Sequence, residues 1–234
     1  MPTIDLTVAG PTEHDWDVVC GTLPTFSWPD CDRLIVVSPH PDDETLGVGG
    51  LIATAVERNV HVLVVAVSDG EAATNTPGLA EIRAGELAAA LSLLGPVGTV
   101  EHRRLRLPDG DLQASIDTLT TKLEQHLRSM DLVLCPLPDD GHPDHHAASV
   151  AATRAARRIG AQLRWFPVWA WHSHDPRCSP LSRANRVVLS ANARARKQRA
   201  MACYVSQLEG PDPVVPAKML IRLDRPYEVL VEPG

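Results

Sequence analysis

Two short segments of the chain concentrate side chains that bind metals and move protons. Residues 38–47 read SPHPDDETLG, and residues 139–146 read DDGHPDHH. Imidazole and carboxylate ligands drawn from two loops, with a water in the remaining position, are the ligand set of an open catalytic zinc site. Such a metal polarises a carbonyl group and lowers the pKa of a bound water. The two segments therefore predict a metal-dependent hydrolase.

Each segment taken alone has other interpretations. An aspartate before a helix is usually an N-cap, which would account for Asp43 or Asp144. The adjacent carboxylates Asp42 and Asp43 also suit magnesium, so a magnesium-dependent phosphohydrolase is one alternative. A non-catalytic sugar-binding module on the same scaffold is another. The two segments together favour catalysis, because clustered polar side chains cost stability unless they bind something.

The elements that position these segments follow an alternating pattern. Apolar runs predict strands at 34–37, 61–67, 100–107, 132–135 and 163–170, and amphipathic stretches predict helices at 46–58, 79–94, 112–128 and 147–159. Residues 187–189 and 228–232, with a helix near 191–204 between them, are expected to extend the sheet. Strands that are apolar on both faces and alternate with helices are typical of a parallel sheet covered on both sides. We therefore expect an α/β, Rossmann-like fold with a mostly parallel sheet flanked by helices on both faces.

In such a sheet the ligand crevice lies beyond the carboxyl ends of the strands, and both polar segments directly follow predicted strands. Glycines at 47, 49 and 50 lack the third glycine of a dinucleotide-binding fingerprint. We interpret them as allowing a helix to approach the sheet closely behind the first polar segment.

Length and composition restrict the classes of protein. The 234 residues suit one domain, with residues 1–32 as an N-terminal arm or cap and residues 33–234 as a single domain. Five scattered cysteines argue against a disulfide framework and a cysteine zinc site. The net charge of −7 gives no basic field for nucleic acid. No apolar run is long enough to span a membrane and no export signal is visible, so we expect a cytoplasmic protein.

Four motifs resemble a known family. His40–Glu44 and His142–His145 look like the two signature motifs of the PIG-L, or LmbE-like, zinc-dependent de-N-acetylases. The spacing of residues 83–95 resembles the helix motif after the second strand of that family, and that of residues 197–207 resembles its C-terminal motif. The resemblance extends across most of the chain from Leu34 onward, and it implies an LmbE-like deacetylase domain. The strong excess of arginine over lysine is typical of a GC-rich bacterial genome.

The family resemblance implies a hydrolase that removes an acetyl group from an N-acetylglucosamine-type conjugate and releases acetate and a free amine. The conjugate would be a precursor of a thiol cofactor, a natural product or a glycolipid. Carried over to this chain, the resemblance implies zinc ligands at His40, Asp43 and His145, a general base at Asp42, a general acid at His142, and an orienting carboxylate at Asp144. We expect Asp144 to raise the pKa of His142. Fe²⁺ suits the same donors as Zn²⁺.

Contacts to the substrate are expected from residues that follow the strands. Arg83 is predicted to hold a polar group of the substrate, although a helical pair with Glu86 is an alternative. Asp109 is predicted to line the pocket.

Rings after the fifth predicted strand suit a sugar face, and they are Trp169, Trp171, His172 and His174. Of these, Trp171 and His172 are predicted to contact the sugar, and packing in the core or at the rim is the alternative for a tryptophan there.

One position departs from the family. Some members carry a tyrosine two residues before the catalytic histidine, where it holds the oxyanion, and this chain has Asp140 there. We therefore expect the oxyanion to be held by another donor, or by zinc and His142 alone. The predicted partner is a small-molecule N-acetylated amino-sugar conjugate, and the apolar surface expected on the arm is compatible with a homo-oligomer.

Overall fold

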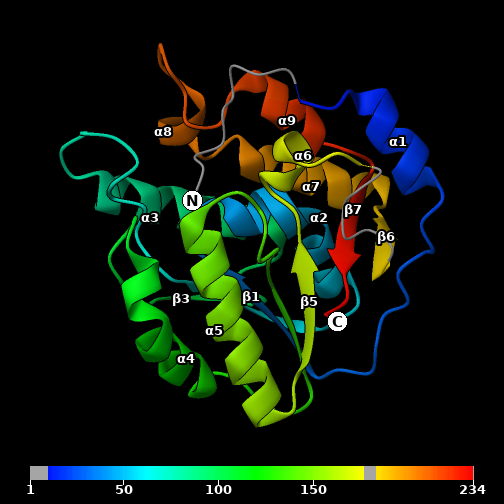
Figure 1. Cartoon of the computed structure of the whole chain (residues 1–234), viewed down its shortest axis with the longest axis horizontal. Coiled ribbons are helices and arrows are strands. Elements are labelled where there is room, and N and C mark those ends of the chain that lie inside the picture. The colour runs from blue at the N-terminus through cyan, green and yellow to red at the C-terminus, as the bar shows by residue number, and fades with distance from the viewer. Residues whose placement is uncertain (1–9, 177–182, 234) are drawn as a thin grey trace.

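A computed structural model describes residues 10–176 and 183–233. Within these residues the strands form one seven-stranded sheet in the order β3-β2-β1-β4-β5-β7-β6 (Figure 1). The strands are β1 (Arg33–Ser38), β2 (His61–Ala66), β3 (Val100–Arg104), β4 (Asp131–Pro136), β5 (Gln162–Phe166), β6 (Ala184–Val188) and β7 (Tyr227–Val231). Strands β1 to β5 pair in parallel, and β7 pairs antiparallel with both β5 and β6. The predicted fold class is confirmed.

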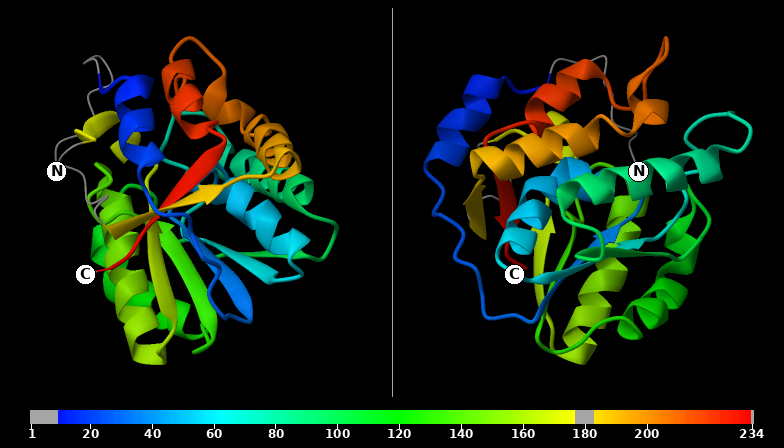
Figure 2. Two further views of the ribbon diagram at one scale, coloured as in Figure 1. Left: turned by 90° about the vertical axis from the view of Figure 1, so that its right-hand side faces the viewer. Right: turned by 180° about the vertical axis from the view of Figure 1, so that it is seen from behind.

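Helices cover both faces of the sheet (Figure 2). The helices are α1 (Glu13–Gly21), α2 (Asp43–Glu57), α3 (Leu79–Leu94), the 3₁₀ helix η1 (Leu112–Ser115), α4 (Ile116–Glu124), α5 (Pro143–Ile159), α6 (Ala170–Ser173), α7 (Ala191–Met201), α8 (Val205–Leu208) and α9 (Ala217–Leu223). Alternate side chains of β1 show the two layers. Leu34 and Val36 pack against the core that α2, α3 and α7 cover, whereas Ile35 and Val37 pack against α4 and α5. No helix among the described residues is long and apolar enough to cross a bilayer.

The glycines of α2 allow this helix to lie directly on the sheet layer. A Cβ atom at Gly47 would collide with the Phe166 ring, and one at Gly50 would collide with Leu189. The interpretation as close-packing positions is thereby confirmed for Gly47 and Gly50, whereas Gly49 faces the Lys197 side chain. The helix is also kinked at Val48, where φ is −139°.

A buried ion pair satisfies the backbone groups beside this kink. The Glu228 carboxylate accepts hydrogen bonds from the backbone N–H groups of Gly50 at 2.8 Å and Leu51 at 2.7 Å. Lys197 Nζ donates to the same carboxylate at 2.7 Å, and both side chains are buried. The pair therefore joins α2, α7 and β7, which are distant in sequence.

Two helices begin earlier than their apolar periodicity predicts. Helix α2 begins at Asp43 instead of residue 46, and α5 begins at Pro143 instead of residue 147. The first turns of both helices are polar, so hydrophobic spacing does not reveal them. As a result, several of the predicted site residues lie at helix N-termini.

Two predicted strands are also shorter in the structure. The strand expected at 100–107 ends at Arg104, and the one expected at 163–170 ends at Phe166 before α6. The helix expected at 112–128 divides into η1 and α4.

The N-terminal segment contains the helix α1, whose start is stabilised by a capping box between Thr12 and Asp15. Trp16 on this helix is buried, and its indole N–H donates to the backbone oxygen of Trp171 at 2.9 Å. The two indole rings meet edge to face with centroids 4.9 Å apart. Glu13 forms ion pairs with Arg222 at 3.2 Å and with Arg225 at 2.6 Å. The segment is thus attached to α6, α9 and the turn after α9, while a domain boundary at residue 32 stays a prediction.

Candidate functional site

The two polar segments meet where the strand order of the sheet reverses, between β1 and β4. Strand β1 lies between β2 and β4, so the chain leaves β1 on one side and returns on the other. The loops after β1 and β4 therefore border the crevice at the carboxyl ends of the strands. There the His40 ring lies with its centroid 4.8 Å from that of His142 and 5.5 Å from that of His145.

Three side chains converge on one point between these loops. Asp43 Oδ2 lies 3.2 Å from His40 Nδ1 and 3.2 Å from His145 Nε2. His145 Nε2 is buried and has no hydrogen-bond partner among the described residues. A buried nitrogen without a partner is costly unless something binds it. Two imidazoles and a carboxylate fit Zn²⁺ or Fe²⁺, so these donors suit the predicted metal.

His142 supplies another ring nitrogen to the same region. The ligand atoms of His40, His142 and His145 lie within 4.8 Å of one another. His142 is the N-cap of α5, and its Nδ1 accepts a hydrogen bond from the backbone N–H of Asp144 at 3.2 Å. Burial, together with the charges of His145 and His40, lowers the pKa of His142 to about 4. The expected rise in this pKa is wrong, because the upward effect of Asp144 is outweighed.

The Asp144 carboxylate faces a different histidine from the expected one. Its Oδ2 lies 3.2 Å from His40 Nε2, and the Asp109 carboxylate lies 3.2 Å from the same nitrogen. The backbone N–H groups of Gly110 and Leu112 donate to Asp144 at 2.8 Å and 3.1 Å. The two carboxylates hold His40 Nε2 and leave Nδ1 directed towards Asp43, an arrangement typical of metal-binding histidines.

The two adjacent aspartates have pKa values that are shifted in opposite directions. Burial works to raise the pKa of Asp43, but His145 and His40 outweigh it and hold this pKa well below its usual range. Burial raises the pKa of Asp42 to about 7, against the lowering effect of Arg83 and with a further rise from Asp43. A carboxyl group that titrates near neutral pH can both accept and release a proton.

Asp42 also has an unusual backbone. Its φ is 143°, in a region that side-chain-bearing residues rarely adopt, and its carboxylate makes no cap hydrogen bond among the described residues. Such strain costs about 1–3 kcal/mol and is concentrated at functional sites. The N-cap positions of α2 and α5 are held by Asp42 and His142, so the N-cap interpretation of Asp43 and Asp144 is wrong.

Arg83 holds the loop that carries Asp42. Its guanidinium donates to the backbone oxygens of Gly70 at 3.0 Å and Pro41 at 2.7 Å, and it lies 3.2 Å from Asp42 Oδ2. The φ of Gly70 is 66°, and a Cβ there would collide with the guanidinium, so the position requires glycine. The alternative pair with Glu86 is not formed, since Glu86 accepts hydrogen bonds from Ser206.

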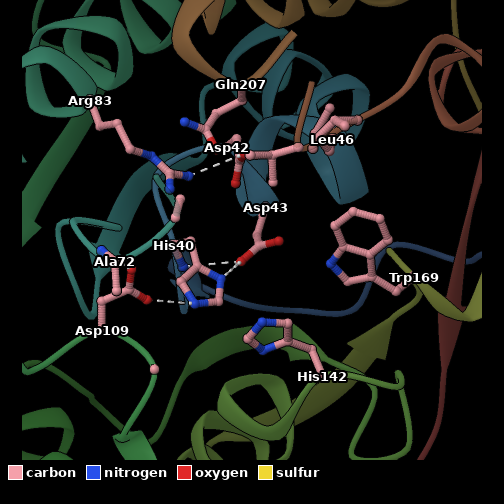
Figure 3. A pocket seen from close by; sticks show the side chains of 14 residues that line it. His40, Asp42, Asp43, Leu46, Ala72, Arg83, Asp109, His142, Trp169 and Gln207 are labelled. Carbon is pink, nitrogen blue, oxygen red and sulfur yellow. Dashed lines mark hydrogen bonds and ion pairs between the residues drawn. The ribbon is translucent and has the colours of Figure 1, made fainter. Parts of the chain in front are cut away.

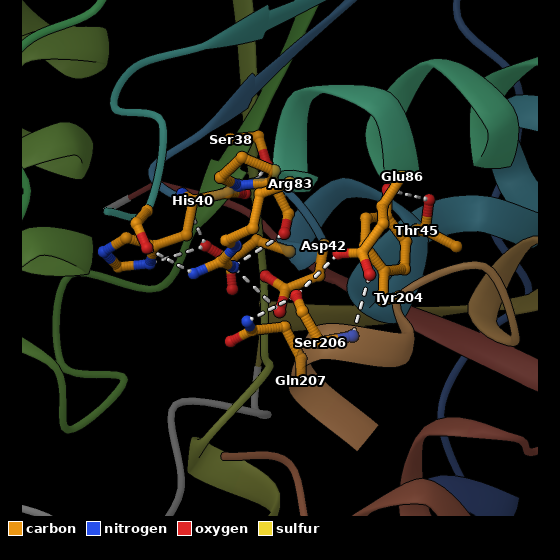
Figure 4. Close-up of polar contacts among 12 residues, drawn as sticks. Ser38, His40, Asp42, Thr45, Arg83, Glu86, Tyr204, Ser206 and Gln207 are labelled. Carbon is orange, nitrogen blue, oxygen red and sulfur yellow. Dashed lines mark hydrogen bonds and ion pairs between the residues drawn. The ribbon is translucent and has the colours of Figure 1, made fainter. Parts of the chain in front are cut away.

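A buried network lies beneath the Asp42 loop (Figure 4). Glu44 accepts hydrogen bonds from Ser38 Oγ at 2.8 Å, Thr45 Oγ1 at 2.6 Å and the Asp42 backbone N–H at 3.2 Å. The Tyr204 hydroxyl donates to the same carboxylate. Tyr204 belongs to the C-terminal motif found in the sequence, so this motif is hydrogen-bonded to Glu44 of the first polar segment.

Asp140 is a residue whose role sequence analysis missed. It is fully buried and accepts a hydrogen bond from His145 Nδ1 at 2.7 Å. It also accepts from the backbone N–H groups of Val168, Trp169 and Ala170, each at 3.0 Å. The sequence signals were its place in the second polar segment and its position two residues before His142, where some members of the family carry a tyrosine.

These residues surround a pocket of about 280 Å³ (Figure 3). The predicted residues His40, Asp42, Asp43, Arg83, Asp109 and His142 line it, together with Leu46, Trp169, Gln207, Val214 and Val215. Gln207, like Tyr204, belongs to the C-terminal motif. Trp169 lies on the opposite side of the pocket from His40 (Figure 3).

Trp171 and His172, the predicted sugar contacts, are not part of the lining among the described residues. Helix α6 turns Trp171 towards Trp16, and the Arg225 guanidinium lies 4.3 Å from the centre of the Trp171 ring. His172 Nδ1 lies 2.9 Å from an Arg222 nitrogen. The aromatic residue of this loop that reaches the pocket is instead Trp169, which precedes α6.

The fold and the site together define an α/β protein with a histidine and carboxylate centre suited to a divalent metal at the carboxyl edge of its sheet. The family model described as PIG-L, GlcNAc-PI de-N-acetylase, matches residues 35–156. The chain belongs to this family. The match begins within β1, includes β2 to β4 and most of α5, and therefore contains both segments that form the centre.

Curated and solved relatives agree with this assignment. A 1D-myo-inositol 2-acetamido-2-deoxy-alpha-D-glucopyranoside deacetylase of Mycolicibacterium smegmatis is 31% identical over 169 residues, which cover 59% of this chain and 58% of the relative. The chain thus matches less than two thirds of that relative's length. A conserved protein from Thermus thermophilus superposes with a TM-score of 0.67 at 28% identity, covering 87% of this chain and 95% of that one. The antimicrobial reagent A40926 pseudoaglycone deacetylase has the same fold, with a TM-score of 0.67 at 24% identity over 87% of this chain and 97% of its own.

Proposed function

We propose that the protein is a zinc-dependent de-N-acetylase that hydrolyses the acetamide of an N-acetylglucosamine-type conjugate to acetate and a free amine. The observation that carries the proposal is the convergence of His40, Asp43 and His145 on one point, with Asp42 beside it in the pocket. The family match and the deacetylases among the relatives support the same reaction class.

The metal would be held by His40 Nδ1, Asp43 Oδ2 and His145 Nε2. When bound, it polarises the acetamide carbonyl and makes a water molecule more acidic. Asp109 and Asp144 hold His40 from behind, and Asp140 holds His145. Fe²⁺ suits these donors as well, so zinc-loaded and iron-loaded protein are to be compared.

Asp42 would take the proton from the attacking water. Its carboxylate lies in the pocket next to the ligand Asp43, and Arg83 fixes the loop that carries it. Arg83 also balances the negative charge of Asp42. A positioned base of this kind contributes about 10²–10⁴-fold to a rate.

His142 would supply a proton to the departing amine. Burial and the neighbouring histidines lower its pKa to about 4, so the resting ring is neutral and must first receive the proton that Asp42 takes from the attacking water. Its Nδ1 is occupied by the backbone N–H of Asp144, so Nε2 is the ring nitrogen left for the substrate. The His142 side chain lines the pocket on the same side as the loop after β4. The base and the acid thus come from different loops and reach the same cavity.

The pocket lining suggests how a sugar conjugate would lie. Asp109 provides a carboxylate for hydroxyl groups on one side, whereas Leu46, Trp169 and Val215 provide apolar surface on the other. A sugar ring has polar edges and apolar faces, and an indole is well suited to contact the latter. We therefore propose a small-molecule amino-sugar conjugate as substrate.

Amine release from a panel of N-acetylglucosaminyl conjugates tests the proposal. The zinc-loaded protein and the iron-loaded protein are each incubated with the panel, and Asp42→Asn gives the background. Asp117→Asn serves as a control, because its carboxylate is on the surface of α4. Release of phosphate from phosphate esters with Mg²⁺, and no amine release with zinc or iron, would favour the phosphohydrolase alternative instead.

A further inference from the structure

Asp140 connects two sides of the pocket that are far apart in sequence. Its carboxylate lies between α5, which carries His145, and the turn from β5 to α6, which carries Trp169. It receives four hydrogen bonds, one from His145 and three from the backbone of residues 168–170. The side chain has no exposed surface. So many donors around one buried carboxylate indicate a specific positioning role.

The contact with His145 determines which ring nitrogen is available to a metal. An ionised carboxylate only accepts hydrogen bonds, so the 2.7 Å contact places a proton on His145 Nδ1. Nε2 then keeps its lone pair, and this is the atom that is buried without a partner beside Asp43. The hydrogen bond therefore sets both the direction of the ring and the nitrogen that it offers.

The contacts with the backbone determine where Trp169 lies. Asp140 Oδ1 accepts from the N–H groups of Val168 and Ala170, and Oδ2 accepts from Trp169. These groups begin α6, a helix of one turn that cannot supply its own partners for them. Because the turn is fixed in this way, the Trp169 side chain is held at the pocket wall (Figure 3).

We propose that Asp140 is a positioning residue that sets the metal-binding tautomer of His145 and, with the same carboxylate, the place of Trp169 in the pocket. Both oxygens are occupied by protein donors, and a carboxylate has no proton to give, so Asp140 is not itself an oxyanion donor. The part that concerns His145 rests on the proposed metal site.

Asp140→Asn tests this role with little change in volume. One of the two oxygens becomes an NH₂ group, which donates instead of accepting. If that group faces His145, it drives the ring proton to Nε2 and competes with the metal. If it faces the turn, the N–H groups of Val168 and Ala170 lose their acceptor. The first orientation also removes the acceptor of the Trp169 N–H, and the second removes the acceptor of its two neighbours. Each orientation therefore disturbs the turn that holds Trp169.

Zinc affinity, measured by competition with a chromophoric chelator, is the first readout. We expect Asp140→Asn to bind zinc about 10–100-fold more weakly than the unchanged protein. Asp139→Asn is the matched control, because the neighbouring carboxylate is 93% exposed, and it should bind zinc normally. Asp140→Ala, which leaves His145 Nδ1 no side-chain acceptor at this position, is measured alongside, and equal zinc affinity in a folded Asp140→Ala protein would overturn the part of the proposal that concerns His145.

Fluorine NMR of protein labelled with 5-fluorotryptophan is the second readout. Trp169→Phe identifies the Trp169 resonance. This resonance should shift or broaden in Asp140→Asn and stay unchanged in Asp139→Asn. An unmoved Trp169 resonance in a folded Asp140→Asn protein would overturn the second part of the proposal.

A measurement on the unchanged protein covers the case in which Asp140→Asn does not fold. In metal-free protein labelled with ¹⁵N-histidine, and at a pH where the His145 ring is neutral, His145 should carry its ring proton on Nδ1, and a proton on Nε2 would contradict the proposal. None of these readouts uses turnover. A protein that shows the predicted zinc and NMR effects but releases no amine would therefore refute the proposed function and leave the role of Asp140 in place.

Discussion

The Asp144 carboxylate bonds to His40, which is 104 residues away, and only its backbone contacts the nearby His142. Asp144 Oδ2 lies 3.2 Å from His40 Nε2, and the backbone N–H groups of Gly110 and Leu112 hold this carboxylate in place. The side chain expected to orient an acid therefore supports a metal ligand. Replacing the Asp144 side chain should therefore weaken metal binding more than it changes the proton donor His142.

The substitution Asp144→Asn tests this assignment. The amide keeps one acceptor but cannot hold His40 and the two backbone N–H groups as the carboxylate does. We expect zinc affinity to fall about 10–100-fold, as for other carboxylates that support metal-binding histidines. Chelator competition measures the affinity, with Asp111→Asn in the neighbouring loop as the control. Normal zinc affinity combined with a loss of activity would return Asp144 to the role of orienting His142.

Arg83 is predicted to act through the geometry of its two backbone contacts as well as through its charge. Arg83→Lys keeps the charge beside Asp42 but cannot donate to Gly70 and Pro41 in the same fork. We expect Arg83→Lys to lose about 10-fold or more in kcat/KM, equal to about 1.4 kcal/mol, and Arg83→Ala to lose more. Steady-state kinetics on the best substrate of the panel measure both. Full activity in Arg83→Lys would mean that charge alone suffices.

Some of this site follows from the sequence, and some of it does not. The alternation of apolar strands and helices predicts the sheet, and the rule for parallel sheets places the two polar segments at one edge. The partners within that edge are not predictable in the same way. His142, Asp144 and His145 share one helical turn, and their side chains leave the helix in different directions, so closeness in sequence does not give their contacts.

The choice between Trp169 and Trp171 illustrates a second limit. Both follow the strand β5, and an extended chain would place both on the same face. The chain instead turns into α6 after Trp169, and this turn directs Trp171 towards Trp16 on α1. The turn depends on the buried carboxylate of Asp140, which is distant in sequence from it.

The N-terminal helix is predicted to contribute to the stability of the domain. Trp16 is buried against Trp171, and replacing a buried tryptophan by alanine costs about 3–5 kcal/mol. We therefore expect Trp16→Ala to lower the free energy of unfolding by about this amount in urea titrations. Val18→Ala on the same helix is the control, because Val18 is exposed, and it should change the free energy of unfolding by less than about 0.5 kcal/mol. Equal stability of the two variants would show that α1 is not part of the folded unit.

The buried ion pair beside the α2 kink makes a separate stability prediction. Lys197→Met leaves the Glu228 carboxylate buried without its cation, which costs about 3–5 kcal/mol. Adding Glu228→Gln to Lys197→Met removes the unpaired charge and should recover part of that loss. Arg199→Met, at an exposed position of α7, is the control. If the double variant were less stable than Lys197→Met, the unpaired charge would not be the source of the loss.

Acetate and free amine, measured together as zinc is added to metal-free protein, test the proposed reaction most directly. We predict that both products appear in equal amounts and that activity reaches a plateau at one zinc ion per chain. We also predict that Asp42→Asn binds zinc but loses at least about 10²-fold in rate. Asp42→Asn protein that binds zinc and turns over as fast as the unchanged protein would contradict the proposed mechanism, because the site would then not use Asp42 as its base.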